Sequence, residues 1–472
     1  MSDFKALAKH STNYFFATIA QKALAFISIP LYTKLLSVYE YGVMSVFLST
    51  VGIVQVLLTL NTEVAVSRYF YDARNEHDFK DFCTTSIKIS SNVWLIMSLI
   101  IIAITPWLAD KLMFSKTLTL CLIPVASYSV INSIFTQIYQ PLLQSRKIAI
   151  VSSVQTYLAF GLSVLFMLCL DSDKYYGYVF GTIMAMIILS TYLIRQIKPF
   201  YVKAKIKKEH VKYLLNYSLP YIPYTLSGII LAQFGRIFMS NYAGFDAAGL
   251  YSFVANIGMI MMILISLFHS AWNPYYLQYM TDKKYSSIDK DYDLIWRITL
   301  VGAAGLSIFG KDIACILSSQ VEYLSGMYML PLIVLGYVFY QWAYVYLRST
   351  GFAKRTIWNA VSIMISGSSN IALSFLLVER FQGLGIAVAF CVSYFVLMVV
   401  SYLINRFILK QYVPNVRLFV FPLVVLTFIY LIYYILDLGT YGLFVRILVF
   451  IFISCILLWK YFDYVMSAFK KI

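Results

Sequence analysis

The chain has 472 residues, of which 61% are hydrophobic and only 12% charged, and its formal net charge is +16. Soluble domains carry about a quarter charged residues, so this composition excludes an ordinary soluble protein. The mean hydropathy of +0.77 indicates a membrane protein, in which an excess of Lys and Arg reflects topology rather than nucleic-acid binding.

Fourteen apolar segments follow one another, each about long enough to cross a hydrocarbon core of roughly 30 Å as a helix. They predict an all-α integral membrane protein with about fourteen transmembrane helices. An even number of spans places both termini on one side of the membrane. The predicted spans are 12–36, 41–61, 84–107, 118–141, 148–170, 176–195, 214–241, 248–271, 295–317, 326–347, 357–378, 383–405, 416–436 and 440–461.

Processing signals and metal motifs are not expected. The first ten residues are polar, and the first apolar span is too long for a signal peptide and lacks a small-residue cleavage site. The six cysteines are scattered without a CxxC pair, so we predict neither a zinc site nor a disulfide framework. They are Cys83, Cys121, Cys169, Cys315, Cys391 and Cys455.

The short loops predict the orientation, because cytosolic loops are enriched in Lys and Arg. With the N-terminus in the cytosol, most of the 37 basic residues fall on the cytosolic side, and the outer loops hold only Lys111, Lys116, Lys174 and Arg380. The bias alternates from loop to loop, which also supports the number of spans. We therefore predict that both termini are cytosolic.

The richest basic segment, Arg195–Lys212, lies between the sixth and seventh spans. It is interpreted as a cytosolic linker between two six-helix halves; contact with anionic lipids is a second interpretation, compatible with the first. The predicted regions are an N-terminal lobe (1–196), the linker (197–213), a C-terminal lobe (214–409) and two additional helices (410–472).

An internal repeat supports the two halves. A shift of 207 residues aligns Gly42-Val43-Met44-Ser45 with Gly249-Leu250-Tyr251-Ser252, Tyr69 with Tyr276 and Lys147 with Lys354. The shift covers six helices, an even number, so we expect parallel repeats about an axis along the membrane normal.

Short motifs in both halves resemble the Wzx-type flippases, the polysaccharide-transporter branch of the multidrug/oligosaccharidyl-lipid/polysaccharide exporter superfamily. The resemblance runs from about residue 10 to about residue 410, and its specificity lies in the order and spacing of the motifs. The matching segments are 31–36 (LYTKLL), 40–42 (EYG), 65–69 (AVSRY), 216–220 (NYSLP), 249–252 (GLYS) and 272–276 (WNPYY). One departure is Gly235-Arg236, where such proteins often have an Asp-Arg pair, so ion pairing there is in doubt.

The resemblance implies two six-helix lobes around a central cavity, alternating access, and undecaprenyl-pyrophosphate-linked oligosaccharide as cargo in the bacterial inner membrane. Membrane lipids, a polysaccharide polymerase and a chain-length regulator are the partners that we expect, without nucleic acid. No cofactor is expected beyond a coupling ion, H⁺ or Na⁺. Moving a diphosphate and a glycan through oil requires cations, hydrogen-bonding side chains and a side opening for the lipid tail.

Lys22 is the first candidate for cargo binding. It lies about eleven residues into its span, roughly 16 Å deep, which is beyond the reach of a snorkelling side chain. It is therefore expected to face the bundle interior or a water-filled cavity. The alternative is a structural lysine bonded to carbonyls of a neighbouring helix.

Further candidates are polar residues at helical spacing. Arg236 and Gln233 share a stripe of the seventh span, although Arg236 is near enough to the outer end to snorkel instead. Asn256 in the eighth span and Ser49 in the second add hydroxyl and amide groups, which also serve helix packing.

Gln137 and Gln140 in the fourth span suit glycan hydroxyls or interhelical hydrogen bonds. Glu63, near the end of the second span, is the candidate acid for cation coupling. Together these residues form the predicted substrate and coupling site, with no catalytic or metal-ligating residue.

Two alternatives to a flippase remain at this stage. A multidrug cation antiporter of the same superfamily favours a central carboxylate in the first lobe, yet spans one, three, four, five and six have none. A polysaccharide polymerase or ligase is an enzyme with sizeable outer loops, whereas the outer loops here reach only about ten residues and His10, His77, His210 and His269 lie in or near cytosolic segments. We therefore predict a transporter rather than an enzyme.

Overall fold

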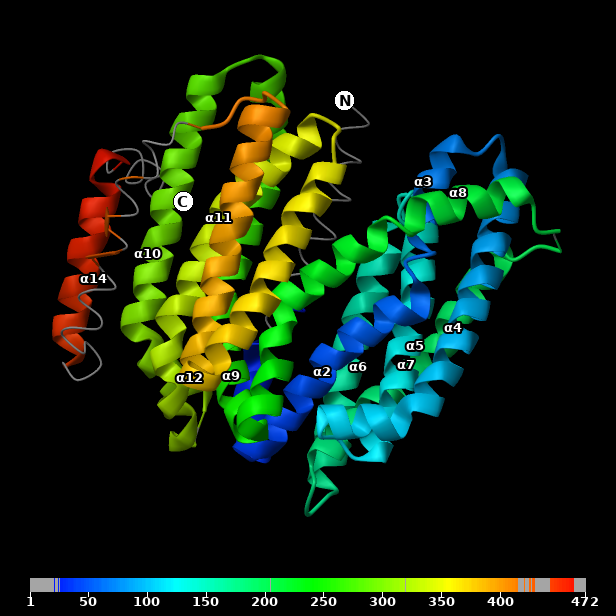
Figure 1. The fold of residues 1–472 in the computed structure, drawn as a ribbon, viewed down its shortest axis with the longest axis horizontal. Helices are drawn as coiled ribbons and strands as arrows, with labels where there is room; N and C mark the ends of the chain where they lie inside the picture. The colour runs from blue at the N-terminus through cyan, green and yellow to red at the C-terminus, as the bar shows by residue number, and fades with distance from the viewer. Residues whose placement is uncertain are drawn as a thin grey trace. The chain divides into compact units, whose positions relative to one another are not determined.

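The regular elements of the computed structural model are all helical among the residues that it describes (Figure 1). These are residues 21–461 except 22, 23, 25, 204, 319, 415–419, 421–423, 426 and 429–441. Contacts group them into two compact units. Unit 1 holds the described residues up to Ile229 together with Arg236–Gly249, and unit 2 holds Ile230–Gly235 and the described residues from Leu250 onward.

The described residues of unit 1 form several helices besides its part of α9. Its elements are α2 (Val38–Thr59), α3 (Val64–Asp72), α4 (Glu76–Leu112), α5 (Lys116–Tyr139), α6 (Ser145–Leu168), α7 (Tyr175–Ile197), the 3₁₀ helix η1 (Lys198–Phe200) and α8 (Lys208–Ser218). In addition, residues 26–35 of the predicted first span are helical.

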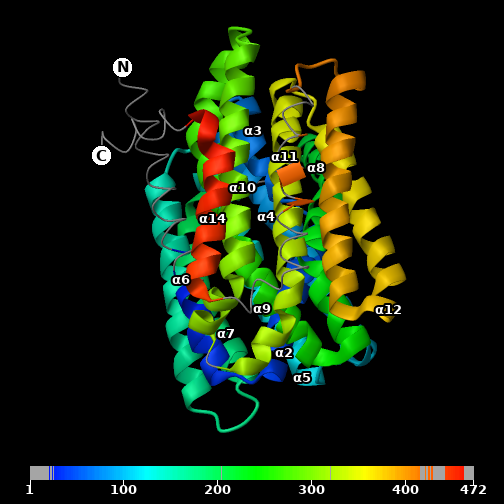
Figure 2. The same ribbon diagram turned by 90° about the vertical axis from the view of Figure 1, so that its left-hand side faces the viewer.

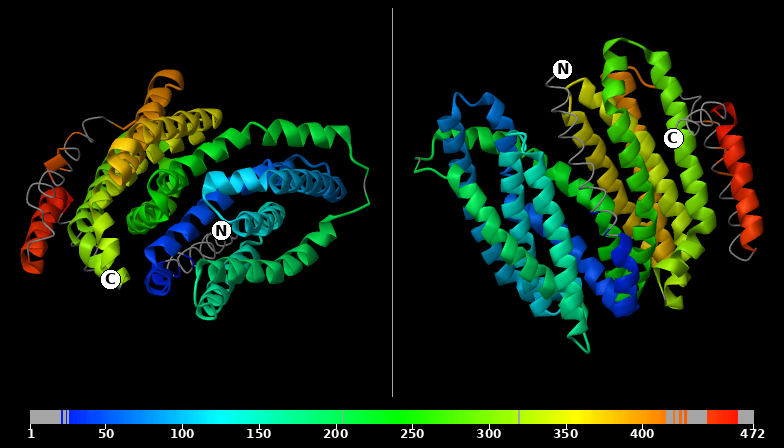
Figure 3. Two further views of the ribbon diagram at one scale, coloured as in Figure 1. Left: turned by 60° about the horizontal axis from the view of Figure 1, so that its bottom comes forward. Right: turned by 180° about the vertical axis from the view of Figure 1, so that it is seen from behind.

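Unit 2 contains the remaining elements and shares α9 with unit 1. They are α9 (Tyr221–Thr281), α10 (Tyr285–Leu317), η2 (Val321–Met329), α11 (Leu330–Phe352), α12 (Ile357–Leu403), the π-helical turn η3 (Ile404–Ile408), α14 (Leu443–Leu458) and η4 (Trp459–Tyr461). α11 packs along α12, and α14 lies beside α10 (Figures 2 and 3).

The predicted fold class is confirmed. The described residues contain ten helices that are long and apolar enough to cross a membrane. Two of these, α9 and α12, are interrupted by non-helical residues, Gly244 (φ 82°) and Gln382 (φ 44°). Each is long enough for two crossings, which agrees with the predicted breaks at 241–248 and 378–383. Most of the predicted thirteenth span, 416–436, lies outside the described residues.

Close helix contacts in unit 1 depend on glycine. A Cβ on Gly181 would lie 2.4 Å from the backbone nitrogen of Ser163, so α6 and α7 approach backbone to backbone. The repeat-related glycines meet in the same way. A Cβ on Gly42 would lie 1.9 Å from the Phe245 carbonyl oxygen, and one on Gly249 would lie 2.2 Å from that of Val38. Two positions related by the 207-residue shift therefore form one reciprocal contact.

The segment after α7 is bound to the start of α4, and we call this contact the α8 junction. Lys207 Nζ lies 2.8 Å from Asp81 Oδ2, and the buried His210 lies with Nε2 3.3 Å from Asp78 Oδ1. Tyr69 of α3 donates to Asp78 Oδ2 at 3.0 Å, and its ring stacks on Phe82. Hence the predicted basic linker includes the start of a helix, α8, that packs against α3 and α4 within unit 1.

Unit 2 has a comparable contact, which we call the α14 junction. Asp293 on α10 is 4% exposed and accepts hydrogen bonds from Arg297 Nε at 3.0 Å and Tyr461 Oη at 2.9 Å. Arg297 also donates to the carbonyl of Leu457 at 2.8 Å, and Lys460 Nζ lies 3.4 Å from Asp293. These bonds hold the end of α14 and η4 against α10.

The contact-based division falls within α9, later in the chain than the predicted linker at 197–213. Asn61 donates to Thr225 at 3.2 Å, and Ile229 is the nearest neighbour that a Cβ on Gly52 would meet. The start of α9 therefore contacts the helices that precede it, whereas the sequence assigned it to the lobe that follows. The predicted four-region division remains a prediction.

Candidate functional site

The predicted site residues fall in different parts of the chain. Lys22 lies outside the described residues. The other candidates of unit 1 are Ser49, Glu63, Gln137, Gln140 and Arg236, and those of unit 2 are Gln233 and Asn256. Each unit is therefore considered separately.

Polar side chains gather around one predicted residue of unit 1 at the break between α2 and α3, here called the polar junction. The helix ends where Leu60 and Asn61 adopt φ values of 46° and 52°, a conformation that terminates helices. The released side chains bind neighbouring helices: Thr62 Oγ1 lies 2.7 Å from Ser90 Oγ on α4, and Asn61 bonds to Thr225 on α9. This break agrees with the predicted end of the second span at residue 61, whereas the short helix α3 that follows it was not predicted.

Glu63 lies at the centre of the polar junction and is only 3% exposed. Its Oε2 atom has no hydrogen-bond partner among the described residues. Burial raises the pKa of Glu63 to about 7, because a buried carboxylate loses the solvation that stabilises its charge. A carboxyl group with this pKa can gain or release a proton close to neutral pH.

The amide and hydroxyl candidates of unit 1 have varied surroundings. Ser49 is buried and donates to the Ser45 carbonyl at 2.9 Å, an ordinary intrahelical bond. Gln137 is half-buried on α5, and Gln140 follows the last residue of that helix and is exposed. Thus Ser49 is satisfied within its own helix, while the two glutamines remain candidates for an external partner.

The first half of α9 carries Gln233 and Arg236 at i and i+3, a spacing that puts both on one face. Arg236 is buried, and both residues take part in interactions. Between them, a Cβ on Gly235 would lie 2.7 Å from Ile386 Cγ2 and 2.9 Å from Tyr251 Oη. The position where similar proteins often have Asp is therefore filled here by its neighbours. Asn256 is half-buried on the second half of α9.

Unit 2 also contains a buried cluster of polar and aromatic side chains. His269 Nε2 lies 2.8 Å from Gln341 Oε1, and Arg348 Nη2 donates to the His269 carbonyl at 3.1 Å. The guanidinium lies between 5.3 and 5.8 Å from the ring centres of Tyr344, Tyr276 and Trp272. Gln341 Nε2 and Arg348 Nη1 have no partner among the described residues and are donors. His269 Nδ1 has none there either, and it is an acceptor because Nε2 of the neutral ring donates to Gln341 Oε1.

One ion pair inside the predicted spans was missed. Arg446 on α14 is buried and donates through Nη1 and Nη2 to the two carboxylate oxygens of Asp312 on α10, at 2.5 and 3.0 Å. The two residues are 134 positions apart, and only their shared location in apolar helices signals the pairing. Asp312 is therefore engaged within unit 2.

Comparison with sequences identifies related proteins. The family model described as polysaccharide biosynthesis protein matches residues 7–280. A protein of Haemophilus influenzae described as Lsg locus putative protein 1 is 24% identical over 291 residues, which cover 58% of this chain and 67% of that protein.

Comparison with solved structures addresses the fold. A lipid II flippase, MurJ, in an inward closed conformation superposes with a TM-score of 0.76 at 14% identity, covering 96% of this chain and 99% of that chain. An inward-facing multidrug resistance transporter of the MATE family and MOP superfamily gives a TM-score of 0.61 at 15% identity, covering 84% and 94%. At these identities the likeness concerns the fold alone.

Proposed function

Because the chain belongs to the polysaccharide biosynthesis protein family, we propose that it is a flippase for undecaprenyl-pyrophosphate-linked oligosaccharide. The membership and the fold confirm the resemblance that the short motifs carry. The observation that supports the proposal most is the match in fold to a lipid II flippase over almost the whole length of both chains. We propose that the repeat unit of O-antigen or a related surface polysaccharide moves from the cytosolic to the outer leaflet of the inner membrane by alternating access.

The proposed cargo combines three chemical parts. Its diphosphate needs cations, for which we propose Lys22 and Arg236. Its glycan needs hydrogen-bonding groups, for which we propose Gln233, Asn256, Ser49, Gln137 and Gln140. Charged groups within a membrane are costly unless they serve a pathway or are paired, so the cations are the most informative of these assignments.

Glu63 is the proposed coupling acid, with H⁺ as the simplest ion. A raised carboxyl pKa means that the folded protein holds the proton at a pH where the unfolded chain has released it. This contribution to stability is therefore present below about pH 4.5 and lost as the pH rises through about 7. Accordingly, Glu63→Gln should flatten the decline in Tm from about pH 5.5 to about pH 8 and abolish any dependence of transport on a proton gradient. Dependence on Na⁺ that survives in Glu63→Gln would contradict the assignment.

The orientation has a direct test. Alkaline phosphatase is active only outside the cytosol, so a fusion after Asp171 should be active and one after Lys208 inactive. Both termini and the Arg195–Lys212 segment would then be cytosolic. The reverse pattern would overturn the proposed direction of transport.

Deletion of the gene tests the cargo. We expect loss of surface polysaccharide and accumulation of lipid-linked repeat units on the cytosolic leaflet, because the steps that build the cargo are untouched. The family of multidrug transporters shares the fold, so drug sensitivity must be measured in the same strain. Normal polysaccharide with altered drug sensitivity would replace the proposal by a cation antiporter.

Lys22 tests the mechanism at one residue. Leaving a lysine at the depth predicted for it costs on the order of 2.5–3.5 kcal/mol, so Lys22→Ala should insert as well as the native chain while surface polysaccharide falls sharply. Lys22→Arg should keep substantial transport, and Lys22→Glu should be worse than Lys22→Ala because it repels a diphosphate. Lys34→Ala, at an exposed position near the end of the same segment, is the matched control. Normal export by Lys22→Ala would show that this lysine is structural.

A further inference from the structure

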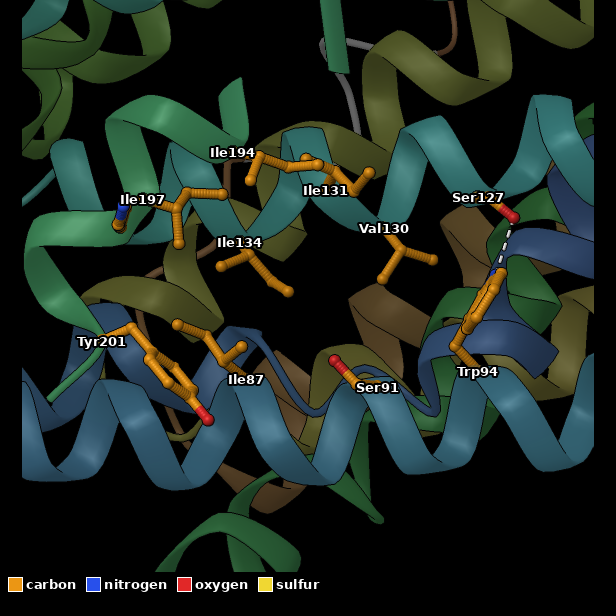
Figure 4. Close-up of a pocket in the computed structure, with 11 residues that line it drawn as sticks. Ile87, Ser91, Trp94, Ser127, Val130, Ile131, Ile134, Ile194, Ile197 and Tyr201 are labelled. Atoms are coloured by element: carbon orange, nitrogen blue, oxygen red, sulfur yellow. Dashed lines mark hydrogen bonds between the residues drawn. The ribbon is translucent and has the colours of Figure 1, made fainter. Parts of the chain in front are cut away.

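An apolar slot of about 420 Å³ lies between α4, α5 and α7 of unit 1 (Figure 4). Its walls are mostly isoleucine, contributed by all three helices: Ile87, Ile131, Ile134, Ile194 and Ile197. Trp94 donates to Ser127 Oγ at 2.6 Å, and these two residues lie at the opposite end of the slot from Tyr201 and Ile197. The volume is within the range of ligand pockets, roughly 300–1,000 Å³.

The end of the slot near Tyr201 is fixed and cationic. Thr84 Oγ1 accepts from the backbone of Val202 at 2.9 Å, which ties the segment after η1 to α4. Phe200 packs against Tyr139 and Phe79 on the side of the core. The neighbouring residues Lys198 and Tyr201 line the slot, and Lys88 Nζ lies 5.9 Å from the centre of the Tyr201 ring. Lys203 and Lys205 follow directly and are exposed.

We propose that this slot binds one acyl chain of an anionic glycerophospholipid, with the phosphate held at Lys198 and Lys88. Only apolar chains surround the membrane-spanning part of a protein, so a hydrocarbon chain is the natural occupant of an apolar slot there. Lipid chains are as apolar as the isoleucine walls, so burial gives one lipid little advantage over another. Selection therefore depends on the headgroup, and clustered lysines at the end of such a pocket favour an anionic one.

The position of the slot favours a resident phospholipid over the proposed cargo. Ile87 and Trp94 are seven residues apart on α4, about 10 Å along the helix axis. That length accommodates part of one chain and leaves the remainder in the bilayer. Anionic phospholipid is also far more abundant in a membrane than a biosynthetic intermediate, so mass action favours it. The proposal requires only that the chain spans a membrane and does not depend on which cargo it moves.

Trp94 provides an intrinsic probe at the far end of the slot. The full-length protein would be titrated in detergent with phosphatidylglycerol whose acyl chains carry bromine near their middle, since bromine quenches tryptophan fluorescence on contact. The chain has seven tryptophans, so the signal is the difference between the native protein and Trp94→Phe. We expect Trp94-dependent quenching by brominated phosphatidylglycerol at concentrations where brominated phosphatidylethanolamine gives little.

Two variants test separately how the lipid headgroup and the acyl chain contribute to binding. Lys198→Gln should weaken the apparent affinity for phosphatidylglycerol about fivefold, the effect of one lysine near an anionic lipid. Ser91→Phe should fill the slot and remove the Trp94-dependent quenching. The controls are Lys111→Gln, at the other end of α4, and Leu95→Phe, an exposed position of α4 that does not line the slot; neither should change the quenching.

The outcomes are distinguishable. Equal quenching by the two phospholipids would show ordinary lipid contact and overturn the headgroup selection. Displacement of brominated phosphatidylglycerol by undecaprenyl phosphate at far lower concentrations than unbrominated phosphatidylglycerol requires would assign the slot to an isoprenoid carrier instead. Lys198 is exposed, so Lys198→Gln is expected to fold and tests the headgroup even if Ser91→Phe does not fold. Because binding is measured without transport, the result stands apart from the proposed flippase activity.

Discussion

The α8 junction of unit 1 and the α14 junction of unit 2 both join a long helix to a later segment through polar and charged side chains. The two junctions differ in the basic residues that they use and in how exposed these residues are. In each, a carboxylate near the start of a long helix, α4 or α10, contacts side chains of a segment from later in the chain. At the α8 junction the carboxylates contact the ammonium of Lys207, which is 48% exposed, and the imidazole ring of His210. At the α14 junction Asp293, which is 4% exposed, pairs with Arg297 of the same helix, which is 12% exposed and also donates to the Leu457 carbonyl. Asp293 also contacts Lys460 of η4, which is 66% exposed.

This difference in basic residues indicates how firmly each segment is held. An arginine is charged at all relevant pH values and binds through several fixed donors, whereas an exposed lysine is screened by salt and a histidine titrates near neutrality. The stability of the α8 junction and that of the α14 junction should therefore respond differently to mutation, pH and salt. α14 is expected to stay docked under conditions that release α8.

The largest effect is expected for Asp293→Asn. Removing one partner of a buried pair leaves Arg297 without its counterion, which typically costs about 3–5 kcal/mol. Arg297 keeps its bond to the Leu457 carbonyl, so the lower end of that range is expected. A drop of several degrees in Tm of the purified protein, measured by thermal unfolding in detergent, would confirm it.

Asp282→Asn is the matched control, because its carboxylate is 37% exposed and pairs with an exposed lysine, Lys284. It should leave Tm within error of the native value. If Asp282→Asn and Asp293→Asn lower Tm equally, the α14 junction is no stronger than a surface contact.

A smaller effect is expected for Asp78→Asn at the α8 junction. The carboxylate accepts from Tyr69 Oη at 3.0 Å and from the backbone nitrogen of Arg74 at 3.2 Å, and it is 14% exposed. An amide keeps one acceptor and loses the charge, so a loss of about 1–3 kcal/mol is expected. Trypsin should also cut after Lys203 and Lys205 faster as α8 is released, whereas Glu76→Gln, at an exposed position, should leave the cleavage rate unchanged.

These junctions also show what the sequence can predict. The apolar spans and their order were predictable because hydrophobicity and length alone determine membrane crossing. The ends of the helices were less predictable. α4 begins at Glu76, eight residues before the predicted span at 84. The reason is that the Asn75 side chain caps a polar first turn that lies outside the apolar stretch. Hydropathy detects the part of a helix that lies in lipid and misses its polar extension.

Pairings between distant residues were beyond prediction. The pair of Asp312 and Arg446 was not predicted, since the two residues lie in different spans and a single sequence contains no information on which helices are neighbours. Glu63 was selected as a coupling acid near the end of a span, but the hydrogen bonds of the adjacent residues Thr62 and Asn61 to Ser90 and Thr225, far along the chain, were not predictable. The assignment of Lys22 stays a prediction.

His210 makes the α8 junction sensitive to pH, with a smaller effect than Asp78→Asn. It lies on α8, before the apolar stretch of α9, and burial lowers the pKa of its ring, which the charge of Asp78 offsets only in part. The unfolded chain therefore binds this proton first as the pH falls through about 6.5, and stability declines below that pH. We expect a loss of about 1 kcal/mol at pH 5.5, absent in His210→Gln. His77→Gln, whose side chain is 78% exposed, should keep the native pH profile.

The smallest effect on stability is expected for Lys207→Gln. The salt dependence of this effect distinguishes the two junctions most clearly. The ammonium lies 2.8 Å from Asp81 but is half-exposed, so the pair is expected to contribute less than about 1 kcal/mol. Screening shortens the Debye length from about 10 Å at 0.1 M to about 3 Å at 1 M salt, so the Tm difference between Lys207→Gln and the native protein should shrink as NaCl is raised. The difference caused by Asp293→Asn should persist, because solvent ions do not reach a pair that is buried on both sides. A salt-independent effect of Lys207→Gln would show instead that Asp81, which is 8% exposed, depends on this lysine as fully as Asp293 depends on Arg297.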